Sequence, residues 1–225
     1  MEKVIIFGAS AGARLIYYSL AQDSSCQVVG FTVDRSYIKE PELCGLPVIP
    51  FEEVESIYPP SECKMLVAVL ANRINKTREE KYLQAKAKGY QFISHISSKA
   101  TTYPDLVIGE NCFIGDFAIC RPSVRIGNDV IIFSGASVGI DSVIKDHCYI
   151  AARALLLGEN TVEPYAMVGA NSTILEGVTV ARECVIGAGA IVHEDTQEKG
   201  VYRAAPPTLL PLPSDKLSRV LFRKS

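Results

Sequence analysis

Residues 108–126 read IGENCFIGDFAICRPSVRI, and a large aliphatic residue returns there at every sixth position. The pattern continues to Val192, and fourteen of its fifteen aliphatic positions hold Ile, Leu or Val, the exception being Cys120. The residue four places later in each unit is nearly always small, and Asn160 is the one amide in that series. A fixed internal period indicates stacked structural repeats, so this repeat decides the fold.

A six-residue period with one large and one small inward-facing residue predicts a narrow prism whose three walls are short parallel strands. Three units make one coil of eighteen residues, so the fifteen units predict five coils and a column about 24 Å tall at ~4.8 Å per coil. Cys112, Cys148 and Cys184 would then stack on one wall about 9.6 Å apart, beyond the ~7 Å that a disulfide spans. We expect these three thiols to fill the core.

The N-terminal part of the chain follows a different pattern, typical of a small α/β domain. The expected strands are 4–7, 26–33, 48–49 and 65–70, and the expected helices are 14–21 and 76–88. Their alternation predicts a Rossmann-like parallel sheet with helices outside it. We therefore expect an α/β domain over 1–95, a β-helix over 96–200, and a tail with a short capping helix over 201–225.

Composition excludes several classes of protein. The 225 residues are 48% apolar and 21% charged, with a net charge of −2 and no basic stripe, which argues against binding to nucleic acid. No apolar run approaches the ~18 residues of a membrane span, and the chain opens on a buried strand, so a cytoplasmic location is expected. The seven cysteines lack a CxxC pair and the three histidines lie far apart, so no metal site is expected.

The turn after the first strand is a candidate phosphate site. Gly8 and Ser10 lie in a small-residue turn that resembles a dinucleotide fingerprint, although Ser10 and Ala13 stand where glycines would be. Such a turn lets backbone N–H groups approach a phosphate at a helix N-terminus. Asp34, at the end of the second strand, is a candidate acceptor for a ribose or base. The alternative is a tight turn and a strand-end cap without a ligand.

Nearly the whole chain resembles the sugar O- and N-acyltransferases grouped with the sialic acid O-acetyltransferase family, which include the N-acetyltransferase of the bacillosamine pathway. The stretches that carry the resemblance are Ile6–Ser10 (IFGAS), His95–Ala100 (HISSKA), the hexapeptides and Ile186–Val192 (IGAGAIV). The resemblance implies a left-handed β-helix, a homotrimer, acetyl-CoA in the groove between neighbouring subunits, and a nucleotide-linked sugar held by the N-terminal domain. A γ-class carbonic anhydrase, which shares the repeat, would need clustered histidine ligands that this chain lacks.

The residue that corresponds to the family's catalytic histidine is Ile140, followed by Asp141. Among the turn positions that recur every six residues, Ile140 is the only large aliphatic residue. We therefore expect it to pack against a neighbouring subunit or an apolar part of a ligand. The alternative is an isolated aliphatic side chain on the surface. Asp141 is a candidate base, although a carboxylate with a pKa of ~3.9 is a weak one. His147 lies at another corner of the prism, so it would reach the site only from an adjacent subunit or is a half-exposed turn residue.

Gly158 lies eighteen residues after Ile140 and should stack on it one coil above. In the family, the matching glycine offers its N–H to the thioester carbonyl; the alternative here is a glycine that merely makes a tight turn. Ala170 and Ala188 are expected along the same edge, where the pantetheine would run. Arg203 is a candidate partner for the CoA phosphates or a solvated arginine.

The sequence supports two hypotheses for the function. Because an amine is a good nucleophile without a base, the missing histidine favours N-acylation over O-acylation, and the first hypothesis is a CoA-dependent acyltransferase acting on a nucleotide-linked sugar in surface-glycan synthesis. The second is a catalytically silent trimeric relative that binds a sugar nucleotide or acts as a scaffold.

Overall fold

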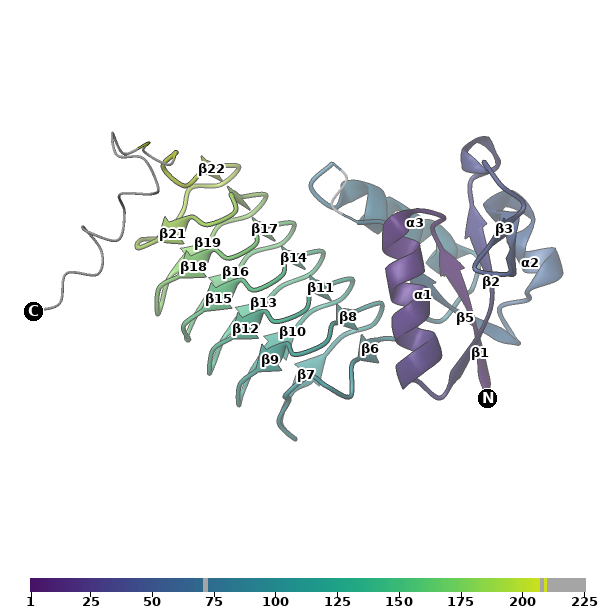
Figure 1. Cartoon of the computed structure of the whole chain (residues 1–225), viewed down its shortest axis with the longest axis horizontal. Coiled ribbons are helices and arrows are strands. Elements are labelled where there is room, and N and C mark those ends of the chain that lie inside the picture. Colours follow the sequence, from purple (N-terminus) through teal and green to yellow (C-terminus); the bar gives the residue numbers. More distant parts are fainter. Residues whose placement is uncertain (71–72, 207–208, 210–225) are drawn as a thin grey trace, which may run out of the picture.

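The computed structural model describes residues 1–70, 73–206 and 209. An α/β part at the N-terminal end adjoins a column of stacked coils that continues toward the C-terminal end (Figure 1). The capping helix expected around Leu217, Val220 and Leu221 lies outside the described residues.

The α/β part is a five-stranded sheet in the order β3-β4-β2-β1-β5. Its strands are β1 (Glu2–Phe7), β2 (Cys26–Val33), β3 (Glu42–Leu43), β4 (Leu46–Pro50) and β5 (Cys63–Val67). Its helices are α1 (Ala11–Asp23), α2 (Val54–Ile57) and α3 (Lys76–Ala87), with short 3₁₀ turns η1 (Arg35–Tyr37) and η2 (Phe51–Glu53). All pairings are parallel except that of β3 with β4, so the predicted parallel sheet has an antiparallel edge strand.

The coils consist of two-residue strands that pair with the strand eighteen residues away, except that β20 pairs with β22 sixteen residues later. They are β6 (His95–Ile96), β7 (Val107–Ile108), β8 (Phe113–Ile114), β9 (Ile119–Cys120), β10 (Arg125–Ile126), β11 (Ile131–Ile132), β12 (Ser137–Val138), β13 (Val143–Ile144), β14 (Tyr149–Ile150), β15 (Leu155–Leu156), β16 (Thr161–Val162), β17 (Met167–Val168), β18 (Thr173–Ile174), β19 (Thr179–Val180), β20 (Val185–Ile186), β21 (Ile191–Val192) and β22 (Val201–Tyr202). They form three parallel walls, of which β22-β20-β17-β14-β11-β8-β6 is the longest.

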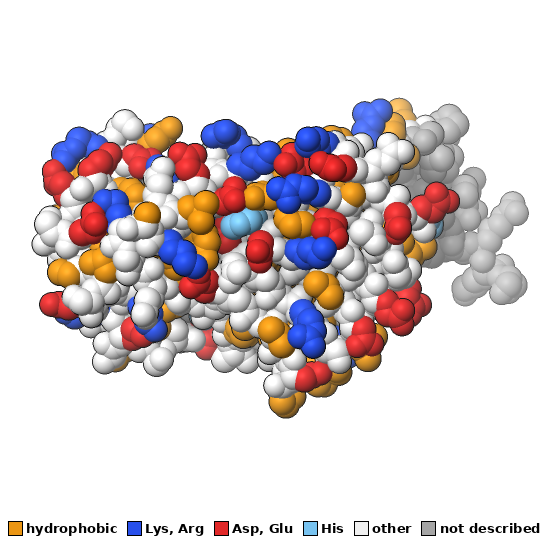
Figure 2. Space-filling model, turned by 180° about the vertical axis from the view of Figure 1, so that it is seen from behind, with side chains coloured by type: hydrophobic (Ala, Val, Ile, Leu, Met, Phe, Trp, Pro, Cys, Tyr) orange, Lys and Arg blue, Asp and Glu red, His pale blue; other side chains and the backbone are white. Residues whose placement is uncertain are grey.

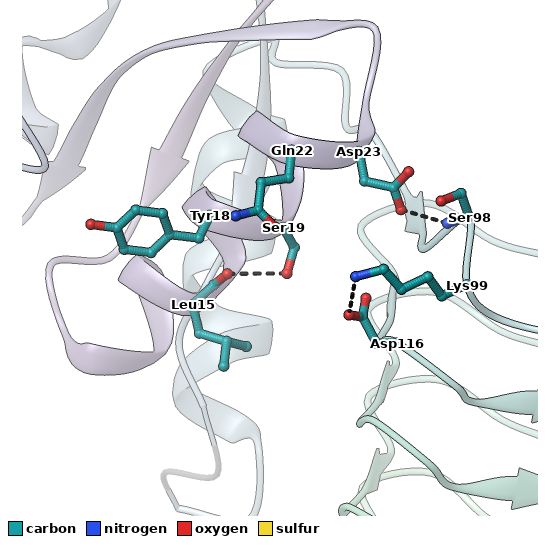
Figure 3. Close-up of a pocket in the computed structure, with 8 residues that line it drawn as sticks. All are labelled: Leu15, Tyr18, Ser19, Gln22, Asp23, Ser98, Lys99 and Asp116. Carbon is teal, nitrogen blue, oxygen red and sulfur yellow. Dashed lines mark hydrogen bonds and ion pairs between the residues drawn. The ribbon is translucent and has the colours of Figure 1, made fainter.

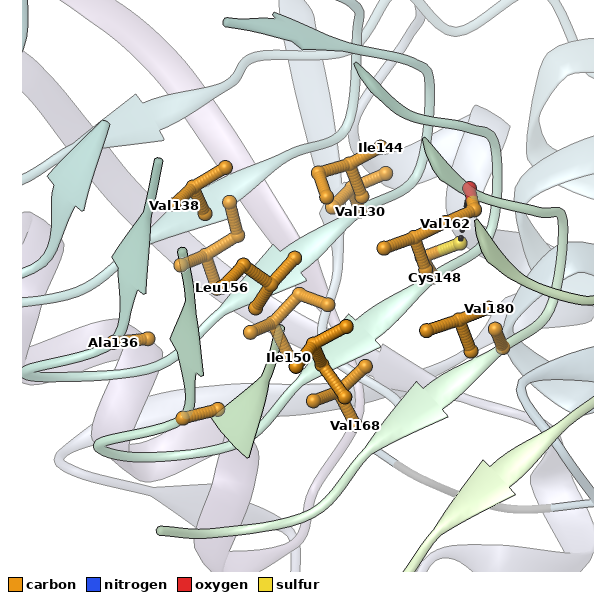
Figure 4. Packing of buried hydrophobic residues seen from close by; sticks show 14 of the residues in the cluster. Val130, Ala136, Val138, Ile144, Cys148, Ile150, Leu156, Val162, Val168 and Val180 are labelled. Atoms are coloured by element: carbon orange, nitrogen blue, oxygen red, sulfur yellow. Dashed lines mark hydrogen bonds between the residues drawn. The ribbon is translucent and has the colours of Figure 1, made fainter. Parts of the chain in front are cut away.

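The predicted inward-facing residues fill the prism. The large aliphatic residue of each unit from Ile114 to Val192 is buried, as is the small residue four places later, and the apolar members of both series form one continuous cluster (Figure 4). Cys112, Cys148 and Cys184 are buried free thiols in that cluster, and burial raises the pKa of Cys112 to about 11. This confirms their prediction as core residues.

The longest wall of the prism packs against the α/β part. Outward-facing Phe113 and Ile131 belong to the same apolar cluster as Ile6 of the sheet and Ile16 and Leu20 of α1. Helix α1 thus lies against both the sheet and the first coils (Figure 1). The longest described helix, α1, has 13 residues, and within the described residues no helix has the length and hydrophobicity of a membrane span.

Candidate functional site

The turn after β1 is tight because the backbone at Ala68, just after β5, lies close beside it. Gly8 has φ +135°, and a Cβ on it would lie 3.2 Å from the carbonyl oxygen of Ala68. Its N–H donates to the carbonyl of Thr32 at 2.8 Å. Ser10 is the exposed N-cap of α1, and its side chain makes no capping hydrogen bond. The turn therefore presents the start of α1 at the carboxyl edge of the sheet, where open α/β sheets bind ligands.

Asp34 lies at the same edge, and a lysine from α3 is paired with it. The Nζ of Lys81 donates to a carboxylate oxygen of Asp34 at 2.7 Å, and both side chains are largely buried. The same ammonium lies 5.7 Å from the ring centre of Phe7. Sequence reasoning missed Lys81, because nothing in a lysine-rich helix distinguishes the one lysine that meets the sheet.

Ile140 and Gly158 stack as predicted at one corner of the prism. The N–H of Glu159 donates to the carbonyl of Ile140 at 2.7 Å, and a Cβ on Gly158 would lie 3.4 Å from the Cγ2 of Ile140. Asp141 is exposed beside them in the left-handed conformation, with φ 55°. These three of the predicted site residues therefore lie together.

The N–H of Gly158 is already used inside the prism, which is a correction to its expected role. It donates to the Oδ1 of Asn160 at 3.1 Å, and both residues are buried. The amide of Asn160 in turn donates to the carbonyls of Leu175 and Val178, at 2.6 and 3.1 Å. Because its hydrogen is directed at this side chain, the Gly158 N–H in this conformation does not face a thioester outside the coil. The sequence feature that indicated this hydrogen bond is Asn160 itself, the one amide in the series of small inward-facing residues.

Replacing Asn160 by alanine is expected to lower the free energy of unfolding by about 2–3 kcal/mol, because one N–H and two carbonyls lose their partner in the core. Chemical denaturation measures the change. The control is Ser172→Ala, at a buried position of the same series where one hydrogen bond to Gly169 is lost, with about 1 kcal/mol expected. Equal effects of the two substitutions would contradict the role of Asn160.

Ala170 and Ala188 do not lie along the edge of Gly158, which corrects a second expectation. Ala170 lies twelve residues beyond Gly158, two thirds of a coil, and therefore occupies another corner. The N–H of Gly189 donates to the carbonyl of Ala170, whereas the N–H of Gly177 donates to that of Gly158. Arg203 shares the corner of the two alanines, its Cα lying 3.2 Å from the position of a Cβ on Gly187.

His147 lies at the third corner, where it faces α3 and is remote from the corner of Ile140. Its Nδ1 is 2.8 Å from a carboxylate oxygen of Asp129, and its ring stacks on Tyr165 with ring centres 5.1 Å apart. Its carbonyl accepts a hydrogen bond from the amide of Asn75. These contacts place His147 where the β-helix packs against α3, a contact region that we call the junction. They do not support a catalytic role for His147 within the same protomer.

The junction holds a buried ion pair that sequence reasoning missed. The Nε of Arg78 in α3 lies 2.6 Å from the Oδ1 of Asp129, and the two side chains are 1% and 0% exposed. This contact is ionic rather than an aligned hydrogen bond, but the Nη2 of Arg78 donates to the carbonyl of Asn111 at 2.6 Å. One sequence feature could have indicated this pair. Five turn residues eighteen positions apart are all polar or aromatic: Asn111, Asp129, His147, Tyr165 and Glu183.

A separate cavity of about 380 Å³ lies between α1 and the first coil (Figure 3). It is lined by Leu15, Tyr18, Ser19, Gln22, Asp23, Ser98, Lys99 and Asp116. Hydrogen bonds from Ser98 lower the pKa of Asp23, and those from Ser97 and Lys99 lower the pKa of Asp116, so both carboxylates stay ionised at neutral pH. None of the predicted site residues lines this cavity. The face of the molecule seen in Figure 2 intersperses acidic and basic side chains, as the near-neutral composition predicts.

Residues 105–139 and 158–194 match the family model for the hexapeptide repeat of succinyl-transferase. Among curated proteins, the chain is 22% identical over 128 residues to a 2,3,4,5-tetrahydropyridine-2,6-dicarboxylate N-succinyltransferase of Xylella fastidiosa, covering 51% of this chain and 46% of the relative. It is 26% identical over 98 residues to an acyl-[acyl-carrier-protein]–UDP-N-acetylglucosamine O-acyltransferase of Nautilia profundicola, covering 40% and 38%. The matches thus span less than half the length of either relative.

Solved structures match over nearly the whole chain. PerB from Caulobacter crescentus, in complex with CoA and GDP-perosamine, has a TM-score of 0.80 at 22% identity, covering 92% of this chain and 96% of that one. The acetyltransferase domain of PglB from Neisseria gonorrhoeae, in complex with acetyl coenzyme A, also has a TM-score of 0.80, at 20% identity, covering 93% and 99%. The predicted fold, an α/β part followed by a left-handed parallel β-helix, is confirmed, and its hexapeptide repeat is similar to that of the family model over 105–139 and 158–194.

Proposed function

We propose that this protein is a CoA-dependent acyltransferase that N-acylates a nucleotide-linked amino sugar, in the cytoplasm, for surface-glycan synthesis. The finer affiliation is the group of sugar acyltransferases that includes the sialic acid O-acetyltransferases. The donor is an acyl-CoA, of which acetyl-CoA is the simplest. The observation that carries the proposal is the fold shared over nearly the whole chain with two structures, one that contains acetyl coenzyme A and one that contains CoA and GDP-perosamine.

The corner at Ile140 favours an amine as the acceptor. A sugar hydroxyl needs a base to remove its proton as it attacks, and losing such a base costs about 10²–10⁴ in rate. Ile140 offers no base, and the exposed carboxylate of Asp141 is a weak one. A sugar amine attacks in its neutral form and releases its proton afterwards, so it loses least from the substitution.

A homotrimer is supported by the wall formed by β9, β12, β15, β18 and β21. Phe117, Leu155 and Ile191 are exposed on or beside this wall, and in the proposed trimer a neighbouring subunit covers them. The wall also separates the corner of Gly158 from that of Ala170, Ala188 and Arg203. In the proposed trimer, a CoA that touches both corners lies between two subunits.

The test is titration calorimetry with acetyl-CoA, followed by thiol release in the presence of nucleotide-linked amino sugars. The proposal expects CoA binding, with thiol released only when an amino sugar is present. The matched hydroxy sugars are the control and should release thiol at least 10²-fold more slowly. Absence of CoA binding would contradict the proposed donor.

Replacing Asp34 by asparagine is expected to weaken the binding of a nucleoside diphosphate by about 10- to 100-fold, because a charged acceptor is lost at the edge of the sheet. Calorimetry with UDP, GDP and dTDP measures the dissociation constants. Glu62→Gln, which removes an exposed carboxylate 3.8 Å from Lys3, is the control and should leave them unchanged. Equal affinities for the Asp34 variant and the native chain would remove Asp34 from the proposed site.

A catalytically silent relative that binds a sugar nucleotide is the second candidate. Two departures from the site that the family resemblance implies favour it, and both lie at one corner. Residue 140 is isoleucine, and the Gly158 N–H is bonded to Asn160. Binding of CoA and nucleotide sugar without thiol release from any pair would support it over the acyltransferase.

A further inference from the structure

The corner of the prism at Gly158 exposes aliphatic side chains to solvent. The side chains of Ile140 and Leu157 are 47% and 45% exposed there. The Cγ2 of Ile140 lies 3.4 Å from the position of a Cβ on Gly158, the residue that directly follows Leu157. Leu175, one coil beyond Leu157, is partly buried against the core cluster. We call Ile140, Leu157 and Leu175 the aliphatic corner.

Charged side chains limit the aliphatic corner along the column. One coil before Gly139 and Ile140, the equivalent positions hold Arg121 and Pro122. One coil after Gly158 stands Glu176, which is exposed, and Asp141 and Glu159 are exposed in the turns alongside. The apolar surface therefore extends over only two to three coils.

This short extent suits a hydrocarbon chain better than another protein surface. A stable interface between subunits buries at least about 1,000 Å², so the two or three side chains of this corner would form only the edge of the interface proposed on the adjoining wall. A second copy packed along this corner would also bring its surface against Arg121, Asp141 and Glu159. A flexible chain of a few methylenes needs only the aliphatic corner itself.

We propose that the acyl group transferred by this protein carries a hydrocarbon chain of about four to eight carbons, held on the aliphatic corner. This inference rests on the proposed acyltransferase function and names its donor. In the reaction, the sugar amine attacks the thioester carbonyl, a C–N bond forms and the C–S bond breaks. The products are the amide and CoA thiol, the amine proton passing to the thiolate or to solvent.

The physical reason is the area left exposed by a short donor. An acetyl group covers the aliphatic corner with one methyl, whereas each further methylene removes more apolar surface from water. Burial of one methylene corresponds to about a 3- to 4-fold gain in affinity. Ile140 and Leu157 are thus specificity-determining residues for chain length in this proposal.

The test compares acetyl-, butyryl-, hexanoyl- and octanoyl-CoA in two measurements on the full chain. Calorimetry without sugar gives the dissociation constants, and thiol release with a nucleotide-linked amino sugar gives kcat/KM. Hexanoyl-CoA is expected to bind at least about 10-fold more tightly than acetyl-CoA, with the same order in kcat/KM. Ile140→Ala and Leu157→Ala should each reduce this preference about 3-fold or more. Ile57→Ala, on α2 with 49% exposure, is the matched control and should keep it.

Three outcomes would overturn the inference in distinguishable ways. Binding of every acyl-CoA with equal affinity, or a preference for acetyl-CoA, would overturn it while leaving the acyltransferase function standing. A chain-length preference that survives both substitutions, together with a change in sedimentation of the variants, would assign the aliphatic corner to a subunit interface instead. Absence of binding by any acyl-CoA would overturn both this inference and the proposed function.

Discussion

Replacing Arg78 by methionine is expected to lower the free energy of unfolding by about 3–5 kcal/mol. Arg78 and Asp129 are both buried, and the substitution leaves the Asp129 carboxylate without its cation. The carbonyls of Val67 and Asn111 lose their guanidinium donors at the same time. Because Val67 ends β5 and Asn111 lies in the first coil, the loss affects both parts of the molecule.

Urea denaturation of the native and variant chains measures this change. Lys3→Met, which removes one member of an exposed pair with 3.8 Å between its charged atoms, is the control and should change stability by no more than about 0.5 kcal/mol. The double variant Arg78→Met with Asp129→Leu should regain part of the loss, because the unpaired buried charge is then gone. A single variant as stable as the native chain would show that the ion pair does not hold the junction.

The fold follows from the sequence because its information is local and repeated. The inward-facing position recurs in every six-residue unit, and fourteen of its fifteen occurrences hold Ile, Leu or Val. The same register predicted that Ile140 and Gly158 stack and that the three stacked cysteines fill the core. In the α/β part, strand β2 has the predicted bounds, because a short apolar run between turn residues defines it.

The site was less predictable because its contacts join residues that are distant in sequence. Lys81 meets Asp34 across 47 positions, and Arg78 meets Asp129 across the junction, and no local pattern marks either partner. The placement of Ala170 and Ala188 was wrong for a simpler reason. All turn positions recur every six residues, but only those eighteen apart share a corner.

Replacing Ile140 by histidine is expected to raise O-acyl transfer to a nucleotide-linked hydroxy sugar by about 10²–10⁴-fold. A neutral imidazole at this exposed corner removes the hydroxyl proton as the oxygen attacks the thioester, which no side chain at 140 does in the native chain. N-acyl transfer should change far less, because the amine attacks without a base. Thiol release with matched hydroxy and amino sugars measures both reactions.

The pH dependence of this variant distinguishes base catalysis from a change in binding. An exposed histidine has a pKa of ~6.5, and only its neutral form accepts a proton. The O-acyl transfer of Ile140→His should therefore rise as pH increases through about 6.5 and then level off. Ile57→His adds an imidazole at a similarly exposed isoleucine on α2 and should leave the rate unchanged. If the rate with the hydroxy sugar stays flat in both variants, position 140 does not correspond to the family's histidine, and the reacting groups meet elsewhere on the prism.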